Sequence, residues 1–151
     1  MPREDFRCAH RVRVRWAEID MQKVVFNGHY LTYIDSAVAE YWREIGLPYP
    51  EGYVDRYAND LYLRKATVEY HGPARYDEML AVLCRVGGMG RSSMNFRFEI
   101  WRDEPTASPS PLITADLVYV NVEVAAAKPA PLPGGLRDRI RAYERIAPAD
   151  S

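Results

Sequence analysis

The chain has 151 residues, of which 48% are hydrophobic and 27% charged, and its formal net charge is -1. This length fits one domain with a buried core, and the balanced charge argues against a broad nucleic-acid-binding surface. The two cysteines, Cys8 and Cys84, have neither a metal-binding nor a redox spacing. The charged N-terminal segment lacks the apolar stretch of a signal peptide, and no run approaches the ~18 apolar residues of a membrane helix. We therefore expect a single cytoplasmic domain over residues 1–151, with no metal, no cofactor and no membrane contact.

The first part of the chain shows two kinds of periodicity. Residues 10–16 alternate between apolar and arginine side chains, which predicts a half-buried β-strand. After a short loop, apolar residues recur at three- and four-residue intervals over residues 30–45, which predicts an amphipathic helix with a wide apolar face. Asn27 is the expected N-cap of this helix, and Gly46 marks its end.

The second part of the chain is predicted to be mostly β-strand. Residues 47–61 contain prolines, a glycine and polar side chains, and are expected to form an irregular connection. Glycine and proline breakers then separate four predicted strands, at residues 62–71, 79–86, 93–102 and 112–124. A short basic helix is expected over residues 134–146. One long helix packed on an antiparallel sheet of about five strands satisfies this order, so the predicted fold class is α+β.

The loop before the long helix carries a recognisable spacing. Asp20 stands four residues before the apolar pair Val24-Val25, and Asn27 and Tyr30 follow at the start of the helix. This arrangement resembles the signature of the 4-hydroxybenzoyl-CoA thioesterase family. In that family an acidic residue precedes an apolar pair, then Asn or an aromatic residue, then a helix with a Tyr near its start.

Two further segments carry the same resemblance. Residues 68–79 contain Pro73 followed by a Tyr-Asp pair, as in the strand–turn–strand element of the family, and residues 90–96 are similar to the basic, hydroxyl-bearing start of its next strand. The resemblance covers roughly residues 10–124. It implies the hotdog fold, in which the sheet wraps around the central helix, and it implies hydrolysis of an acyl-CoA thioester to the free acid and CoA.

The resemblance also implies catalytic roles. Asp20 would be the catalytic carboxylate, acting either as a general base on water or as a nucleophile. The unpaired backbone N–H groups at the helix start, near Asn27 and Gly28, would polarise the thioester carbonyl. His29 is a further candidate for a hydrogen bond to the substrate or to Asp20. Glu18, two residues before Asp20, is better interpreted as a structural or solvent-facing residue.

Candidate substrate-binding residues fall into two groups. Coenzyme A carries three phosphate groups, and a guanidinium and two hydroxyls that follow a glycine-rich turn are suited to bind them. These phosphate-binding candidates are Arg91, Ser92 and Ser93. The acyl pocket is expected to be lined by apolar and aromatic side chains near the helix start, such as Val25, Phe26, Tyr30 and Tyr33.

A single sheet around one helix leaves its edges open, which small proteins rarely tolerate alone. In the resembling family, two subunits pair their sheets edge to edge and the active site lies between them. We therefore expect a homodimer or a homotetramer. Acyl-CoA is the expected substrate, and no nucleic-acid partner is expected.

Lys23 departs from the family pattern, which usually has glycine at this position. A lysine there must adopt an ordinary backbone conformation or accept strain. This departure supports a second hypothesis, a non-catalytic hotdog module that binds acyl-CoA or an aromatic ligand. A third hypothesis is a hotdog hydratase or dehydratase of acyl thioesters. Such relatives use a His with an acidic partner, and none of His10, His29 and His71 stands in that pattern.

Overall fold

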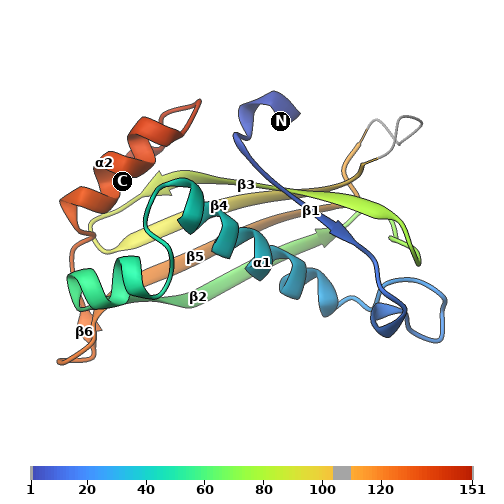
Figure 1. Ribbon diagram of the computed structural model, residues 1–151, viewed down its shortest axis with the longest axis horizontal. Helices are drawn as coiled ribbons and strands as arrows, with labels where there is room; N and C mark the ends of the chain where they lie inside the picture. The colour runs from blue at the N-terminus through green and yellow to red at the C-terminus, as the bar shows by residue number, and fades with distance from the viewer. Residues whose placement is uncertain (1, 104–109, 151) are drawn as a thin grey trace.

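The computed structural model describes residues 2–103 and 110–150, and its main feature is a curled antiparallel sheet wrapped around one long helix (Figure 1). The helix is α1 (His29–Glu44). Across the sheet, the five long strands follow the order β1 (Cys8–Arg13), β3 (Met79–Met89), β4 (Ser93–Arg102), β5 (Ile113–Glu123) and β2 (Asn59–Tyr70). The predicted hotdog fold is therefore confirmed.

Short elements complete the sheet and cover one end of it. The two-residue strands β6 (Lys128–Pro129) and β7 (Ala149–Asp150) pair with β5 and β3 respectively. The C-terminal helix α2 (Gly134–Tyr143) lies at the end of the molecule opposite the start of α1 (Figure 1). Among the residues that the structure describes, no helix is long and apolar enough to cross a bilayer.

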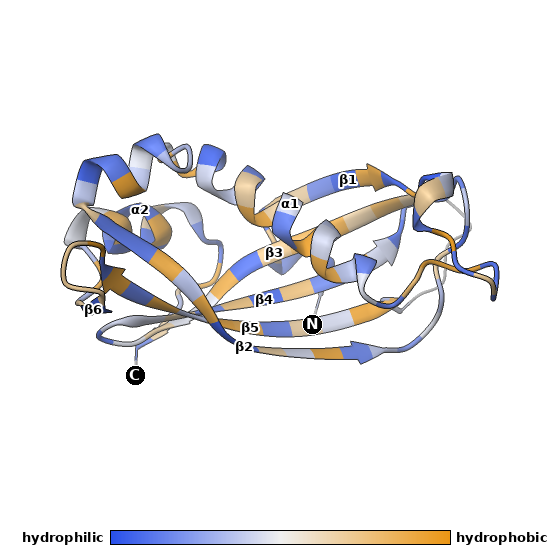
Figure 2. Ribbon diagram, turned by 90° about the horizontal axis from the view of Figure 1, so that it is seen from below, coloured by the Kyte–Doolittle hydropathy of each residue, from blue (hydrophilic) through white to orange (hydrophobic). Residues whose placement is uncertain are grey.

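Side-chain alternation along the strands forms the face that contacts α1. Figure 2 shows apolar and polar residues succeeding one another along the strands beneath the helix. In β4, the buried apolar residues are Met94, Phe96, Phe98 and Ile100. From α1, the buried residues are Tyr30, Tyr33, Ile34, Ala37, Tyr41 and Trp42. Because these two sets share one hydrophobic cluster, burial of the apolar stripe fixes α1 on this face of the sheet.

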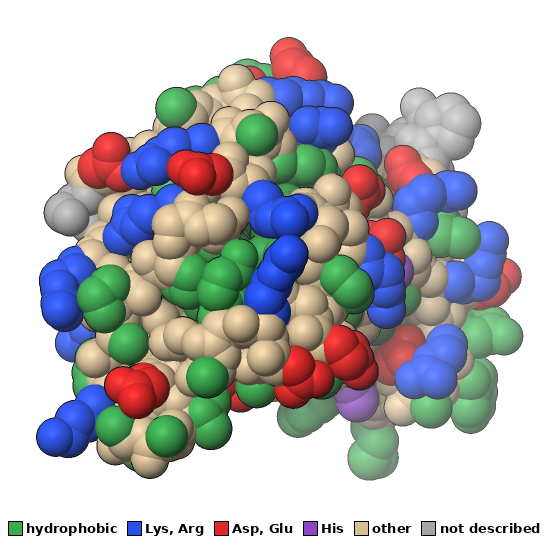
Figure 3. Space-filling model, turned by 60° about the vertical axis from the view of Figure 1, so that its left-hand side comes forward, with side chains coloured by type: hydrophobic (Ala, Val, Ile, Leu, Met, Phe, Trp, Pro, Cys, Tyr) green, Lys and Arg blue, Asp and Glu red, His purple; other side chains and the backbone are tan. Residues whose placement is uncertain are grey.

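The arginines of α2 attach that helix to neighbouring backbone. Arg137 donates to the carbonyl of Gly90, and Arg139 donates to the carbonyl of Ile45 at 3.1 Å. Figure 3 shows this end of the molecule, where basic side chains are interspersed with acidic and apolar ones. These two arginines thus stabilise the ends of other elements, and they do not form a separate charged site.

Several boundaries differ from the sequence prediction. The first strand was predicted over residues 10–16, but β1 spans Cys8–Arg13. A 3-10 turn over Trp16–Glu18 begins before the alternating pattern of the sequence ends. The connection predicted to be irregular contains a helical turn at Glu51–Asp55. The N-cap of α1 is Gly28, and no side chain caps this helix. The cap prediction for Asn27 is therefore wrong, and a backbone bond from the His29 N–H to the Phe26 carbonyl (2.9 Å) forms the turn instead.

Strand β2 forms one edge of the sheet and is unusually exposed. It pairs with β5 on one side, and the described part of the chain provides no strand for its other side. Three large apolar or aromatic side chains on β2 are at least half exposed, namely Tyr62, Leu63 and Tyr70. An exposed edge with apolar side chains is a template for pairing with another chain.

The packing of α1 generates a stability prediction. Ile34→Ala removes a side chain that is 1% exposed, so we expect the free energy of unfolding to fall by about 2–5 kcal/mol, because a cavity is left in the core. Ser36→Ala, at an exposed position of the same helix, should change it by less than about 0.5 kcal/mol. Denaturant unfolding measures both values, and equal effects would contradict the described orientation of α1.

Candidate active site

The loop between β1 and α1 holds Asp20 by backbone hydrogen bonds. The N–H of Asp20 donates to the carbonyl of Val24 at 3.0 Å, and the N–H of Lys23 donates to the carbonyl of Asp20 at 3.0 Å. The Asp20 side chain is also oriented, since its Oδ1 accepts a hydrogen bond from the N–H of Gln22 at 2.8 Å. Its Oδ2 has no recorded partner in the described part of the chain, so this oxygen is free to contact a ligand or water.

Lys23 adopts the left-handed backbone conformation, with φ 63°. This is the conformation that a glycine would take at no steric cost, whereas a residue with a side chain pays about 1–2 kcal/mol. The turn is retained because the Lys23 N–H is bonded to Asp20. The lysine therefore accepts the strain, and the loop keeps the shape for which the resembling family uses glycine.

Glu18 is a buried structural carboxylate. The residue is only 6% exposed. Its carboxylate accepts three hydrogen bonds of 2.7 Å, from the Arg15 backbone N–H, the Arg15 Nε and the Tyr33 hydroxyl. Burial alone would raise the pKa of Glu18, but these hydrogen bonds and the Arg15 charge together lower it below its usual value. Glu18 thus connects the end of the first strand to α1, in agreement with its structural interpretation.

The start of α1 presents free hydrogen-bond donors. The N–H of His29 is used by the Phe26 carbonyl, but the structure records no acceptor for the N–H groups of Asn27 and Gly28 within its described ranges. Both stand at the positive end of the helix dipole. These two groups are therefore available to bind a developing negative charge.

A hollow of about 390 Å³ adjoins Asp20 and the start of α1. Its lining residues are Asp20, Gln22, Val24, Val25, Asn27, Tyr30, Tyr70, His71, Gly72 and Pro73. Of the residues predicted for the site, the hollow brings together Asp20, Val25, Asn27 and Tyr30. A carboxylate, the residue Asn27 with its free N–H group, and an apolar wall thus meet in one place.

Three other predicted residues of this segment, Phe26, Gly28 and His29, do not line the hollow. The ring of His29 packs edge-on against the ring of Phe26, with centroids 5.7 Å apart. Neither side chain lines the hollow. The structure therefore does not place His29 against Asp20 within one chain, and the ring contact accounts for its position.

The predicted phosphate-binding residues lie at the other end of the sheet. Ser93 pairs with Val120, which pairs in turn with Tyr62 of β2. Tyr70, which lines the hollow, is eight residues farther along β2, or about 26 Å at 3.3 Å per residue. One chain therefore does not bring Arg91, Ser92 and Ser93 to Asp20.

The turn between β2 and β3 contributes residues that the sequence did not assign to the site. The last residue of β2, Tyr70, and the turn residues His71, Gly72 and Pro73 line the hollow. The buried hydroxyl of Tyr30 accepts a hydrogen bond from the Ala74 N–H at 3.0 Å, which attaches the turn to α1. The resemblance of residues 68–79 to a family element was the signal that could have identified this wall.

The side chains around the hollow do not form a cluster of metal ligands. Across residues 2–103 and 110–150, no group of three or more His, Cys, Asp or Glu side chains could hold a metal ion. The groups that the described chain offers to a ligand at the start of α1 are the Asp20 carboxylate and the backbone N–H groups beside it.

The role of Glu18 can be tested through pH. Its lowered pKa means that the carboxylate stabilises the fold above its unfolded pKa near 4.5, and that this contribution is lost as the pH falls through the folded value. We expect Glu18→Gln to lower the free energy of unfolding by about 1–3 kcal/mol at pH 7, and the difference from wild type to shrink in acid. Glu44→Gln, at an exposed position at the end of α1, is the matched control and should have little effect. A pH-independent loss in Glu18→Gln would contradict the electrostatic account.

Comparison with known proteins supports the identity of the fold and the family. The model of the thioesterase superfamily matches residues 22–108. The acyl-CoA thioester hydrolase YbgC of Escherichia coli O6:H1 is 31% identical over 81% of this chain and 87% of its own. A thioesterase from Thermus thermophilus, solved as a complex with coenzyme A and Zn, is 29% identical with a TM-score of 0.78, covering 95% of this chain and 98% of that one.

A thioesterase superfamily protein from Jannaschia sp. CCS1 is more distant in sequence, at 20% identity, yet its TM-score is 0.83 over 97% of this chain and 99% of its own. That likeness shows the fold. The sequence matches go further, because the family model covers more than half of the chain and the relative exceeds 30% identity. The chain belongs to the thioesterase superfamily.

Proposed function

We propose that this enzyme hydrolyses acyl-CoA thioesters in the hollow beside Asp20. The observation that carries the proposal is that the Asp20 carboxylate and Asn27 line one hollow at the start of α1, where the N–H groups of Asn27 and of the next residue, Gly28, are free. YbgC is named an acyl-CoA thioester hydrolase, and the Thermus thioesterase was solved with coenzyme A. Both names support CoA as the carrier of the acyl group.

In the proposed reaction, the thioester carbonyl oxygen is bound by the N–H groups of Asn27 and Gly28. Asp20 acts through its free Oδ2, either by taking a proton from water as the water attacks the carbonyl carbon, or by attacking that carbon itself to form a mixed anhydride that water then hydrolyses. In both routes the C–S bond breaks, a C–O bond forms, and the CoA thiol carries away the proton. One preorganised donor for the oxyanion contributes about 3–4 kcal/mol in other enzymes.

A homodimer would complete the site. If two β2 strands pair antiparallel, the end of one strand near Tyr70 lies beside the opposite end of the other. Arg91 belongs to that opposite end, because its neighbour Ser93 is in register with Tyr62. Arg91 of the partner subunit would then lie at the same end of the paired β2 strands as Asp20 of the first subunit. This geometry supports phosphate binding across the subunit boundary, with Ser92 and Ser93 as further donors.

The structure weakens the main argument for a binding module without activity. That hypothesis rested on Lys23, and Lys23 adopts the left-handed conformation expected of glycine. For the hydratase hypothesis, His71 is the one histidine that lines the hollow. Its Nε2 is 2.9 Å from the hydroxyl of Thr114, so this ring already has a structural partner. Thioester hydrolysis therefore remains the function that the site supports best.

The Asp20 role can be tested by the release of CoA thiol from a panel of acyl-CoA esters. We expect Asp20→Asn to lower kcat/KM by about 10²–10⁴-fold while CoA-ester binding persists, because the variant keeps the shape and loses the base or nucleophile. Asp138→Asn, at an exposed position on α2, is the control and should retain full activity. Undiminished turnover by Asp20→Asn would remove Asp20 from the mechanism. Binding of CoA esters without any thiol release by the wild type would reject the hydrolase.

The role of the β2 edge can be tested by sedimentation. We expect the 17.4 kDa chain to sediment as a dimer or a higher even assembly. Leu63→Glu places a charge on the exposed edge strand, and should shift the equilibrium toward monomer and lower the activity. Ile146→Glu changes a side chain of similar exposure beyond α2 and should do neither. An unchanged assembly in Leu63→Glu would place the interface elsewhere.

A further inference from the structure

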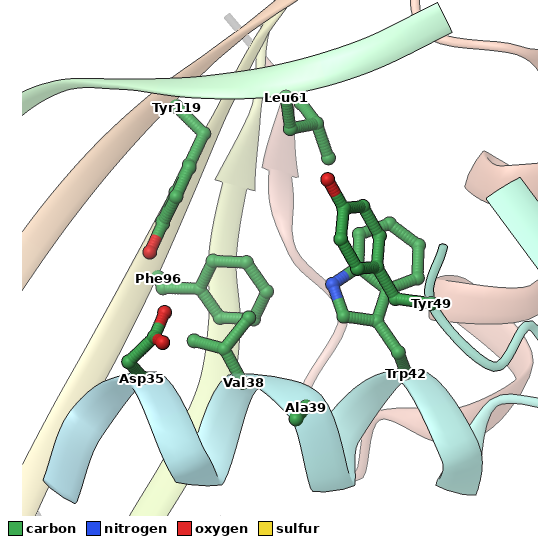
Figure 4. A pocket seen from close by; sticks show the side chains of 8 residues that line it. All are labelled: Asp35, Val38, Ala39, Trp42, Tyr49, Leu61, Phe96 and Tyr119. Atoms are coloured by element: carbon green, nitrogen blue, oxygen red, sulfur yellow. The ribbon is translucent and has the colours of Figure 1, made fainter. Parts of the chain in front are cut away.

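A second hollow lies between the middle of α1 and the sheet (Figure 4). Its volume is about 200 Å³, and its lining residues are all different from those of the hollow beside Asp20. Val38 lines the second hollow and Tyr30 lines the first. Eight residues separate them on α1, which corresponds to about 12 Å along the helix axis. The second hollow is therefore a separate place for a ligand.

Aromatic residues make up half of the eight that line it. Trp42 and Tyr49 lie on one side with ring centroids 6.1 Å apart, and Tyr119 lies on the other with Phe96 between the two sides (Figure 4). The centroids of Phe96 and Tyr119 are 5.6 Å apart. The faces of aromatic rings carry negative electrostatic potential and attract cations, most strongly when the cation is desolvated.

Asp35 supplies a full negative charge to the same hollow. Its carboxylate points from α1 toward the space below Tyr119 (Figure 4). Within the described part of the chain, this carboxylate has no recorded hydrogen bond or ion pair. Burial and then the Asp35 charge raise the pKa of Tyr119. For Tyr49, burial, the hydrogen bond to Asp60 and nearby charges including Asp35 raise the pKa to about 12.

Both tyrosines therefore stay neutral at physiological pH, and Asp35 is the charge that a ligand would meet. A purely hydrocarbon ligand would cover this carboxylate and give it no partner, which is unfavourable. A cationic ligand would satisfy both the carboxylate and the rings. The volume corresponds to roughly six or seven water molecules at ~30 Å³ each, which is a suitable space for a small branched ammonium group.

We propose that this hollow binds an organic ammonium group of trimethylammonium size, with the rings around the methyl groups and Asp35 as the counter-ion. The group has two sources of the same chemistry. It is either a free small cation, or the far end of an acyl chain whose thioester is bound in the hollow beside Asp20. The first source is independent of the hydrolase, and the second rests on the proposed function.

Binding can be measured with choline and its neutral isostere 3,3-dimethylbutan-1-ol. The reporter is the indole N–H signal of Trp42 in a ¹⁵N spectrum. Trp16 and Trp101, the two other tryptophans of the chain, serve as internal references because neither lines this hollow. We expect choline to shift the Trp42 signal saturably and to bind about tenfold more tightly than the isostere.

Variants separate charge from shape. Asp35→Asn, at an exposed position, should weaken choline binding about tenfold and leave the isostere unaffected. Tyr49→Leu should weaken choline binding, whereas Tyr49→Phe keeps the ring and should not. Asp20→Asn should leave choline binding unchanged. An Asp35→Asn variant that binds choline as the wild type does would overturn the proposal.

The source of the cation is assigned by hydrolysis. Two CoA esters of equal chain length are compared, one ending in a trimethylammonium group and one in a tert-butyl group. A preference in kcat/KM for the charged ester that disappears in Asp35→Asn assigns the pocket to the acyl end. Choline binding without such a preference assigns it to a free cation. If neither choline nor the charged ester is preferred over its neutral analogue, the cation site is rejected, while thiol release from the neutral ester would leave the proposed hydrolase standing.

Discussion

The buried carboxylate of Glu18 is the constraint on which the geometry of the site depends. Placing a carboxylate at 6% exposure costs free energy unless hydrogen bonds compensate, and here Arg15 and Tyr33 supply them at 2.7 Å each. The backbone carbonyl of the same residue also accepts the Phe26 N–H at 3.0 Å. One residue thus holds the end of the first strand, the loop and the helix together. Because Asp20 is only two residues away, these contacts also fix its position.

A second set of contacts prepares the start of α1 without using its free donors. The turn after β2 holds the helix through the Tyr30–Ala74 hydrogen bond, and the Ala74 carbonyl accepts the Val25 N–H at 2.9 Å. The Tyr70 hydroxyl donates to the carbonyl of Asn27 at 3.3 Å. None of these bonds uses the N–H group of Asn27 or of Gly28, so both groups stay available within the described part of the chain. Donors fixed before the substrate arrives need no reorganisation during the reaction, which is what makes them effective.

Local patterns in the sequence predicted the parts of the structure that depend on local physics. The 3.6-residue period of α1 and the alternation in β4 follow from burial of one face, and both elements are confirmed. The order of these elements indicated the fold class, and the spacing around Asp20 indicated the family. The prediction that the Asn27 side chain caps α1 was wrong, because a backbone hydrogen bond from the His29 N–H to the Phe26 carbonyl forms the turn instead.

The sequence could not predict how far apart two residues lie along the paired strands of the sheet. Register alone decides that Tyr70 lines the first hollow while Ser93 lies at the far end, and register depends on pairings between residues far apart in the chain. The second hollow was also hidden, because Asp35 has the pattern of an ordinary polar residue on the outer face of a helix. Its neighbours Phe96 and Tyr119 come from strands far from it in sequence.

The most direct test of the proposed mechanism is a structure with an acyl-CoA analogue in which a methylene group replaces the thioester sulfur, so that the carbonyl is kept and hydrolysis is blocked. We expect the carbonyl oxygen to lie about 3 Å from the N–H nitrogen of Asn27 or Gly28. Asp20 should lie on the same side as the carbonyl carbon, within direct reach or one water of it. A carbonyl bound away from the start of α1, with Asp20 facing solvent, would contradict the mechanism.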